Sequence, residues 1–288
     1  MQTFPHKKWN PFIQLDFHKG IFLTGPIPVP GGAWHIGGAV LALPFIYIGT
    51  PKVNDCKVLA NGMEVVSRGH EPKYLIIPHW NLFPPPFVPA APNLLIPLLL
   101  LTSSNKCQFA VGSVVGKDGP IAVSILKYVG INQACQEFCT APTSITFNWG
   151  TVELGFTWGD LVASLLCMAF DSLKSFLEYL VFSKLADIIP KGLFKNQMKS
   201  LLGRLGLPKI FRGVGGRFAS MSERMVAEGL TALSKALYGE TFGGGNLGQA
   251  TGFDSIDPIN MVANGAGEGA DRLGAWIDGR SESFYDYD

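Results

Sequence analysis

Cysteine and histidine are the residues of this chain whose side chains could bind a metal ion, and there are five of each. The cysteines are odd in number and lack C-x-x-C spacing, which does not fit an extracellular disulfide framework. Free thiols or a metal site fit better. Cys135 and Cys139 lie four residues apart and could share a ligand cluster. Cys56 and Cys167 lie in apolar or strand-like surroundings and are predicted to be buried as small hydrophobes.

Residue patterns typical of catalysis are missing. The sequence contains no G-x-S-x-G elbow, no H-E-x-x-H helix and no G-x-x-x-x-G-K-[ST] loop. The segment 243–248 resembles a dinucleotide loop only superficially, because no strand signal precedes it. The remaining polar candidates are expected to be solvated: His6, His70, Asp254, Asp257, Glu268 and Asp271. We therefore expect a protein that is not an enzyme.

Two segments of the first half have the signature of a β-hairpin, residues 57–66 and 114–123. Each is centred on a pair that favours a type I′ turn, Asn61-Gly62 in the first and Asp118-Gly119 in the second. Asn61-Gly62 precedes His79 by about as many residues as Asp118-Gly119 precedes Cys135 and Cys139. Equivalent repeats would place His79 and the cysteine pair in similar positions.

Prolines shape the rest of the first half. The segment 25–32 carries prolines at alternate positions, which favours an extended, edge-like backbone and disfavours a central strand. Nearly all prolines and β-branched runs lie before about residue 156, whereas helical patterns and glycine-rich tracts follow. The sequence predicts an α+β protein with a β-rich region 1–156, an amphipathic helical region 157–238 and a glycine-rich acidic tail 239–288.

A long helix is predicted at the start of the second half. Leucines and other apolar residues recur at helical spacing from Leu161, Asp160 could cap the N-terminus, and Pro190 ends the pattern. A second amphipathic stretch covers residues 217–237, and glycine-rich loops follow it. Five charges interrupt the first helix, which makes a membrane-spanning segment an unfavourable interpretation: Asp171, Lys174, Glu178, Lys184 and Asp187.

The net charge of +1 argues against nucleic-acid binding by the whole chain, but it conceals an asymmetry. The segment 184–224 is strongly basic and contains only two acids, Asp187 and Glu223. The apolar run 92–101 is too short and too rich in proline to span a bilayer. The first ten residues are polar, so no conventional secretory signal is predicted.

The order of motifs in residues 13–170 resembles that of PAAR-like proteins. The quoted motifs are Leu15-Asp16-Phe17-His18, Gly25-Pro26-Ile27-Pro28-Val29-Pro30, His35, Val58-Leu59-Ala60-Asn61-Gly62, Pro78-His79, the Cys135 region with Ala141-Pro142, and Thr151-Val152-Glu153-Leu154-Gly155-Phe156. PAAR-like proteins sharpen the spike of bacterial type VI secretion and related contractile injection systems, often as the N-terminal module of Rhs-type effectors. This chain departs from their usual short repeat, and it carries a long insertion around residues 81–106.

The resemblance implies a rigid β-rich cone, closed at its apex by a structural zinc ion. The implied ligands are His18, His35 and His79 with Cys135 or Cys139, and Cys107 could replace either cysteine. It also implies a trimeric, VgrG-like spike protein as the partner at the broad base, and an effector, chaperone or adaptor on the C-terminal helices. Such a protein is made in the bacterial cytoplasm and leaves on the spike, with transient membrane contact during puncture.

Two other functions compete with this one. The helical half could be a membrane-active toxin whose basic segment 184–224 binds anionic lipid, although a solvated helix face explains the same pattern. The chain could also be a metalloenzyme or a ligand-binding β-domain with a helical appendage. The lack of paired acids or of a nucleophile motif disfavours the latter.

Overall fold

The computed structural model describes residues 1–24, 29–41, 57–69, 80–82, 85–89, 105–116, 119–134, 141–188 and 258–280. These residues form several antiparallel sheets and two helices, which confirms the expected α+β class. The strands are β1 (Gln2–Thr3), β2 (Pro11–Phe22), β3 (Val29–Val40), β4 (Leu59–Ala60), β5 (Met63–Glu64), β6 (Trp80–Leu82), β7 (Phe87–Pro89), β8 (Asn105–Lys106), β9 (Ala110–Gly116), β10 (Gly119–Ala122), β11 (Val129–Ala134), β12 (Ala141–Phe147) and β13 (Leu154–Gly155); the helices are α2 (Trp158–Ile188) and α7 (Pro258–Ile277).

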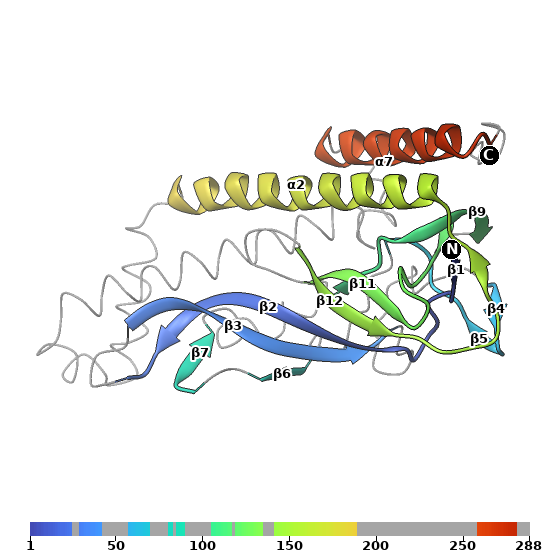
Figure 1. Ribbon diagram of the computed structural model, residues 1–288. Coiled ribbons are helices and arrows are strands. Elements are labelled where there is room, and N and C mark those ends of the chain that lie inside the picture. Colours follow the sequence, from blue (N-terminus) through green and yellow to red (C-terminus); the bar gives the residue numbers. More distant parts are fainter. Residues whose placement is uncertain are drawn as a thin grey trace, which may run out of the picture.

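The largest sheet has seven strands in the order β6-β3-β2-β12-β11-β8, and β7 pairs with β2 beside this path. Strands β2 and β3 pair along their full length of twelve residues each, from Pro11 opposite Val40 to Phe22 opposite Val29. They form the long ribbon at the front of Figure 1. This ribbon makes the molecule elongated, because all the short hairpins lie near one of its ends.

Both predicted hairpins are present. Strands β4 and β5 are joined by Asn61 and Gly62, whose φ angles of 54° and 74° are those of a type I′ turn. The second hairpin pairs β9 with β10, and Gly116 lies opposite Gly119. Gly119 is therefore the first residue of a strand rather than part of the turn, so the prediction was one residue out of position.

The β-rich region is held together at its two ends. Strand β1 pairs with β13, and the backbone N–H of Phe156 donates to the carbonyl of Met1 at 2.7 Å. The N-terminal ammonium donates to the carbonyl of Phe156 at 2.5 Å. The side chain of Phe156 is buried with Phe109, Val111, Val123 and Met168. The first and last residues of the segment 1–156 thus lie side by side.

The described part of the proline-rich segment, residues 29–32, lies in strand β3. Pro30 lies within β3, which has β2 on one side and β6 on the other. Strand β6 pairs only with Ile36, Gly37 and Gly38. Within the described residues, Pro30 therefore has a paired strand on one side alone, which its missing N–H tolerates.

The predicted long helix is confirmed as α2, but it starts at Trp158 rather than Leu161. The N-cap is Thr157, not Asp160. The hydroxyl oxygen of Thr157 accepts from the backbone N–H of Asp160 at 3.1 Å, and the Asp160 carboxylate accepts from the N–H of Thr157 at 3.1 Å. This reciprocal pair is a capping box, in which the acid occupies the third helical position.

The glycine-rich stretch 265–269 was predicted as a loop, and this was wrong, because it lies inside α7. Its helix packs antiparallel against α2 through small residues. A Cβ on Gly274 would lie 2.6 Å from the carbonyl oxygen of Gly159, so the two backbones touch there. Cys167 Sγ lies 4.0 Å from the carbonyl oxygen of Gly267. The missing side chain of Gly274 permits this close approach. A Cβ on Gly265, Gly267 or Gly269 would meet nothing within 4 Å, so those three glycines are not required by packing on α2.

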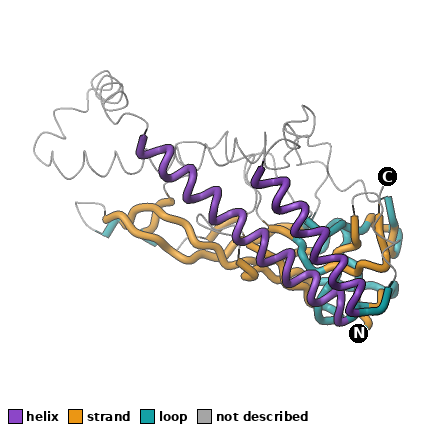
Figure 2. Tube along the Cα trace, turned by 90° about the horizontal axis from the view of Figure 1, so that it is seen from above, coloured by secondary structure: helices purple, strands orange, loops and turns teal. Residues whose placement is uncertain are grey.

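The helices form a layer along one side of the β-rich region, with α7 outermost (Figure 1). Seen from above in Figure 2, they run side by side and α2 extends well beyond α7. Met168 of α2 joins the hydrophobic cluster of Phe109 and Val111. Gln133 of β11 donates to the carbonyl of Met168 at 3.0 Å and to the hydroxyl of Ser172 at 2.9 Å. None of the described helices is long and apolar enough to cross a membrane.

Several predictions concern residues outside the described ranges. These are the surface position of His70, the burial of Cys56, the second amphipathic stretch at 217–237, the glycines at 243–245, and Asp254 and Asp257. They stay predictions, as do the two boundaries between the three predicted regions.

Candidate functional site

Of the five predicted zinc ligands, His35 alone has a described side chain. It is buried on β3 directly opposite Asp16 of β2, with Nε2 at 3.8 Å from Asp16 Oδ2. Both side chains are fully enclosed. Gln14, two residues before Asp16, donates from Nε2 to the same carboxylate oxygen at 2.8 Å. This forms a buried polar row along the β2–β3 ribbon.

The strand register places His18 on the same face of the ribbon. His18 lies opposite Ala33, two residues from His35, so the two histidines are diagonal neighbours. The side chain of His18 is not among those described, and His79, Cys135 and Cys139 lie outside the described ranges altogether. The register therefore brings the backbone positions of His18 and His35 close together, and metal binding by any of the five residues stays a prediction.

A structural zinc ion takes four ligands in tetrahedral geometry. The described side chains supply one imidazole and one carboxylate here. Among the residues with described side chains, no group of three or more His, Cys, Asp and Glu could hold a metal. A complete site at His35 would need ligands from outside this set.

Cys107, the alternative thiol ligand, contacts a different histidine. Its Sγ lies 3.7 Å from Nδ1 of His6, and both residues are fully buried. The surface position predicted for His6 was wrong, because residues 4–7 run through the interior. The N–H of His6 donates to the carbonyl of Ala122 at 2.8 Å, and its carbonyl accepts from Val66 at 2.9 Å.

The pair of His6 and Cys107 is unsuited to nucleophilic chemistry. Burial raises the pKa of the Cys107 thiol, so the thiolate that attacks substrates is disfavoured. The imidazole of His6 packs so closely on Gly130 that any side chain there would overlap with it. We interpret the pair as a structural contact at the centre of the β-rich region. Cys167 is also buried, as predicted.

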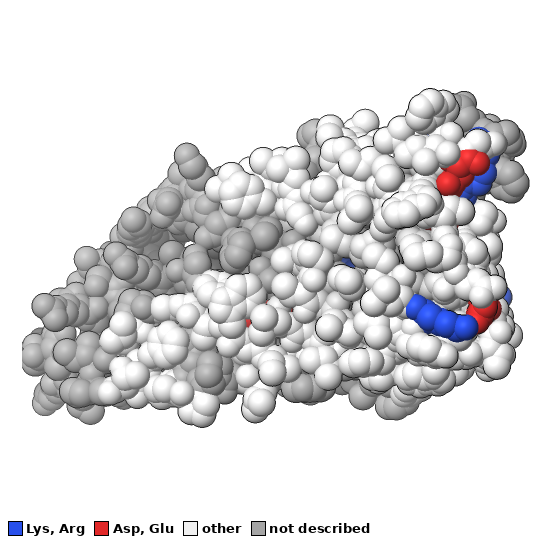
Figure 3. Space-filling model, viewed as in Figure 1, with Lys and Arg blue, Asp and Glu red and all other residues white. Residues whose placement is uncertain are grey.

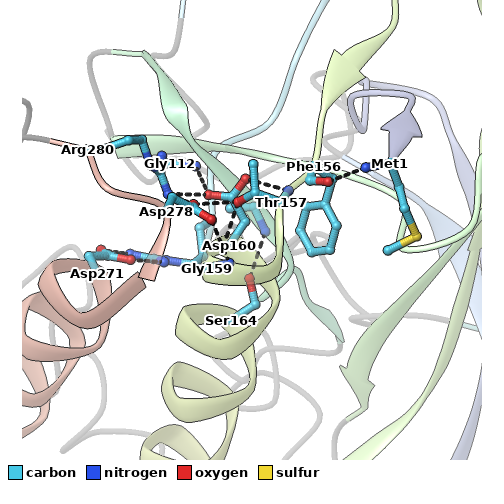
Figure 4. A network of polar contacts seen from close by, with 12 residues as sticks. Met1, Gly112, Phe156, Thr157, Gly159, Asp160, Ser164, Asp271, Asp278 and Arg280 are labelled. Carbon is cyan, nitrogen blue, oxygen red and sulfur yellow. Dashed lines mark hydrogen bonds and ion pairs between the residues drawn. The ribbon is translucent and has the colours of Figure 1, made fainter. Parts of the chain in front are cut away.

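A polar network fixes the start of α2 (Figure 4). Asp278, just beyond the end of α7, accepts from the backbone N–H of Gly159 at 3.0 Å and from the hydroxyl of Thr157 at 2.6 Å. Arg280 donates to Asp278 at 2.6 Å and to Asp160 at 2.9 Å. Asp160 also accepts from the N–H of Gly112 in β9 at 3.0 Å. The end of α7 thereby joins the start of α2 to the sheet.

Asp271 of α7 was expected to be a solvated acid, and this was wrong. It is buried, and it accepts from Arg68 Nη1 at 2.6 Å and from Nη2 in a bidentate ion pair. Lys106 of β8 forms a second ion pair with Asp171 of α2. Both acids therefore hold the helical layer on the β-rich region.

The opposite face of the large sheet is apolar and exposed. The register places these side chains in neighbouring rows: Ile145 is opposite Ile13, Leu15 is opposite Ile36, and Ile36 is opposite Leu82. Phe17 and Trp34 are also opposite each other, with ring centroids 5.2 Å apart. Between 41% and 67% of each large side chain is exposed at Ile13, Leu15, Trp34, Ile36, Leu82 and Ile145. Below, these six residues are called the apolar sheet face.

The polar residues of the same strands lie on the buried side. Ser144, Thr146 and Asn132 are buried beside Gln14 and Asp16, and Asn132 Nδ2 donates to Thr146 Oγ1 at 2.6 Å. The sheet thus reverses the usual arrangement of a half-buried sheet. On the side of the molecule shown in Figure 3, the charged side chains of the described residues gather at one end.

Comparisons with protein-family models, with curated proteins and with solved structures give no match for this chain.

The apolar sheet face was not predicted, although the sequence contains a pattern that indicates it. The run from Ile13 to His18 alternates apolar and polar residues, which is typical of a strand with two unlike faces. Alternation alone does not say which face is buried. Asp16 was quoted only as part of a family motif, because its contact with His35 depends on the register of two strands.

Proposed function

We propose that this protein caps the trimeric, VgrG-like spike of a bacterial contractile injection or type VI secretion system. The observation that carries the proposal is the apolar sheet face. Monomeric proteins rarely expose a contiguous apolar patch, and such patches mark binding sites for other proteins or for membranes. The six described side chains of this face are all uncharged, which suits docking on the blunt end of a spike, since interface cores are depleted of charge.

The interior of the β-rich region supports the same function. A spike tip must stay folded under force, and this region is cross-linked by short hairpins and by buried polar contacts. Asn148 Nδ2, for example, donates to the carbonyl of Pro5 at 2.8 Å and to Ser124 Oγ at 3.1 Å. A network in which buried polar groups are hydrogen-bonded makes a sheet rigid. A cone shape for the β-rich region is part of this proposal.

Zinc is a separate part of the proposal. His35 would bind the ion together with His18, His79 and one of Cys135 and Cys139, and the ion would tie their segments together. Elemental mass spectrometry of the purified full chain should find about one zinc per chain, and the variant His35→Ala should lose it. The variant His6→Gln is the matched control and should keep the metal. Metal-free wild type in a folded sample would contradict this part.

The test of spike binding uses the full chain and the trimeric spike protein from the same genome. Native mass spectrometry should detect one copy of the chain on each spike trimer. The double variant Ile13→Thr/Ile36→Thr should bind at least about tenfold more weakly, because it removes apolar area from the interface. Threonine keeps the strand propensity of the replaced residues.

A matched control places the same change elsewhere. Leu59 and Leu126 are 66% and 62% exposed and lie outside the apolar sheet face. The variant Leu59→Thr/Leu126→Thr should bind the spike as the wild type does. Absence of any complex would refute the spike-tip function, and equal binding by both variants would refute the sheet face as its docking surface.

A further inference from the structure

The outer surface of α2 carries a continuous apolar stripe. Leu165, Phe170, Leu173, Phe176, Leu177, Leu180 and Val181 follow one another at helical spacing on one side of the helix, and all seven are exposed. Val162 and Leu166 lie on the same side and are half-buried. The stripe therefore runs over about five turns of a helix that completes one turn every 3.6 residues.

The opposite side of α2 holds its polar groups. Asp160 pairs with Arg280, Asp171 pairs with Lys106, and Ser164 is buried beneath the sheet, where it accepts from the N–H of Ala110 at 3.2 Å. The helix thus turns its described acids inward and its large apolar residues outward. A helix on the surface of a globular protein has the reverse arrangement.

Helix α7 follows the same rule. Gly274 on its inner side lies against the backbone of Gly159 in α2, while Val262, Leu273, Trp276 and Ile277 are exposed. Trp276 is 77% exposed, and Trp158, at the same end of the helix pair, is 73% exposed. Tryptophan is enriched where an apolar phase meets water, because its ring is amphipathic.

The charge of the chain decides between possible partners. The sequence that begins at the end of α2, residues 184–224, contains nine lysines and arginines against two acids: Lys184, Lys191, Lys195, Lys199, Arg204, Lys209, Arg212, Arg217 and Arg224 against Asp187 and Glu223. Basic residues next to an exposed apolar helix face are the two signals that together hold a protein on anionic lipid. A second copy of the chain carries the same basic segment and therefore offers it no complementary charge.

We propose that the exposed apolar stripe of α2, extended by Trp276 of α7, binds the surface of an anionic lipid membrane. The helices lie on the membrane rather than crossing it. This proposal does not depend on the spike-tip function, because the apolar sheet face and the helical layer are different surfaces of the chain.

The experiment is flotation of the full chain with two kinds of vesicle, phosphatidylcholine alone and phosphatidylcholine mixed with phosphatidylglycerol. The wild type should float with the anionic vesicles and only weakly with the neutral ones. The variant Leu173→Gln/Phe176→Gln should lower the partition coefficient about tenfold or more, since two apolar side chains no longer leave water. Glutamine keeps helix propensity, so α2 should persist, as circular dichroism can verify.

The control Leu59→Gln/Leu126→Gln adds the same groups at exposed positions outside the helices and should bind as the wild type does. Salt at about 1 M, where the Debye length is about 3 Å, should weaken the anionic binding. Three results would overturn the proposal: no flotation of the wild type, equal binding to both kinds of vesicle, or equal loss in both variants. A dimer in solution that dissociates in Leu173→Gln/Phe176→Gln would assign the stripe to a second copy instead.

Discussion

The large sheet and the helix pair both expose their apolar side chains, but they bury different groups. The sheet encloses a row of polar residues, Gln14, Asp16 and His35, which contact one another across two strands. The helices enclose glycine and alanine, so that the backbones of α2 and α7 touch. In the sheet, hydrogen bonds offset the cost of burying polar groups. In the helix pair, the close approach of the two backbones provides dispersion contacts without large side chains. Each region is thereby left with an apolar surface.

The difference between interior and surface can be tested most strongly at Phe156. Its side chain is 1% exposed and packs against Phe109, Val111 and Met168, where the sheet meets α2. Phe156→Ala should lower the free energy of unfolding by about 3–5 kcal/mol, since it leaves a cavity. Urea denaturation measures this. Ile13→Ala on the apolar sheet face should cost less than about 1 kcal/mol; equal costs would mean that the face is not a surface.

The attachment of the helices can be tested at Arg68. Arg68→Met removes the cation that faces the buried carboxylate of Asp271, which should cost about 3 kcal/mol because an uncompensated charge stays buried. Relative to the wild type, the variant Arg68→Met should show a larger increase in the hydrogen-exchange rate in α7 than in β11. The double variant Arg68→Met/Asp271→Leu should recover most of the stability. If it is as unstable as the single variant, the ion pair does not hold α7.

A smaller effect is expected at the start of α2. Thr157→Val removes the hydroxyl that accepts from the N–H of Asp160 and donates to Asp278, and it should cost about 1 kcal/mol. Thermal denaturation measures this. Thr143→Val removes an exposed hydroxyl that donates to the carbonyl of Leu15, and the change in stability should stay within about 0.5 kcal/mol. A larger effect of Thr143→Val would reverse the assignment of the stabilising contact.

Local chemistry was predictable from the sequence. Asn61-Gly62 determines its own turn, and the apolar spacing after Thr157 determines α2, because both depend on residues close in sequence. Three features were not predictable. The burial of His6 depends on strands more than 50 residues away, the bidentate pair of Asp271 depends on Arg68, and the close approach of Gly274 to α2 depends on Gly159, more than 100 residues earlier.

The candidate site divides in the same way. His35 and His18 were identified from a motif order, and the β2–β3 register places them on one face. The contact of His35 with Asp16 required that register. The alternation of residues 13–18 indicated two unlike faces, but which side of a strand is buried depends on what packs against it.

The apolar sheet face and the apolar stripe of α2 are predicted to bind different partners. One pair of binding measurements can test this directly. Dissociation constants for the trimeric spike and for anionic vesicles should be measured with the wild type, with Ile13→Thr/Ile36→Thr and with Leu173→Gln/Phe176→Gln. The first variant should lose affinity for the spike alone, and the second should lose affinity for the vesicles alone. Unchanged affinity of the first variant for the spike, or the same losses in both variants, would contradict the account.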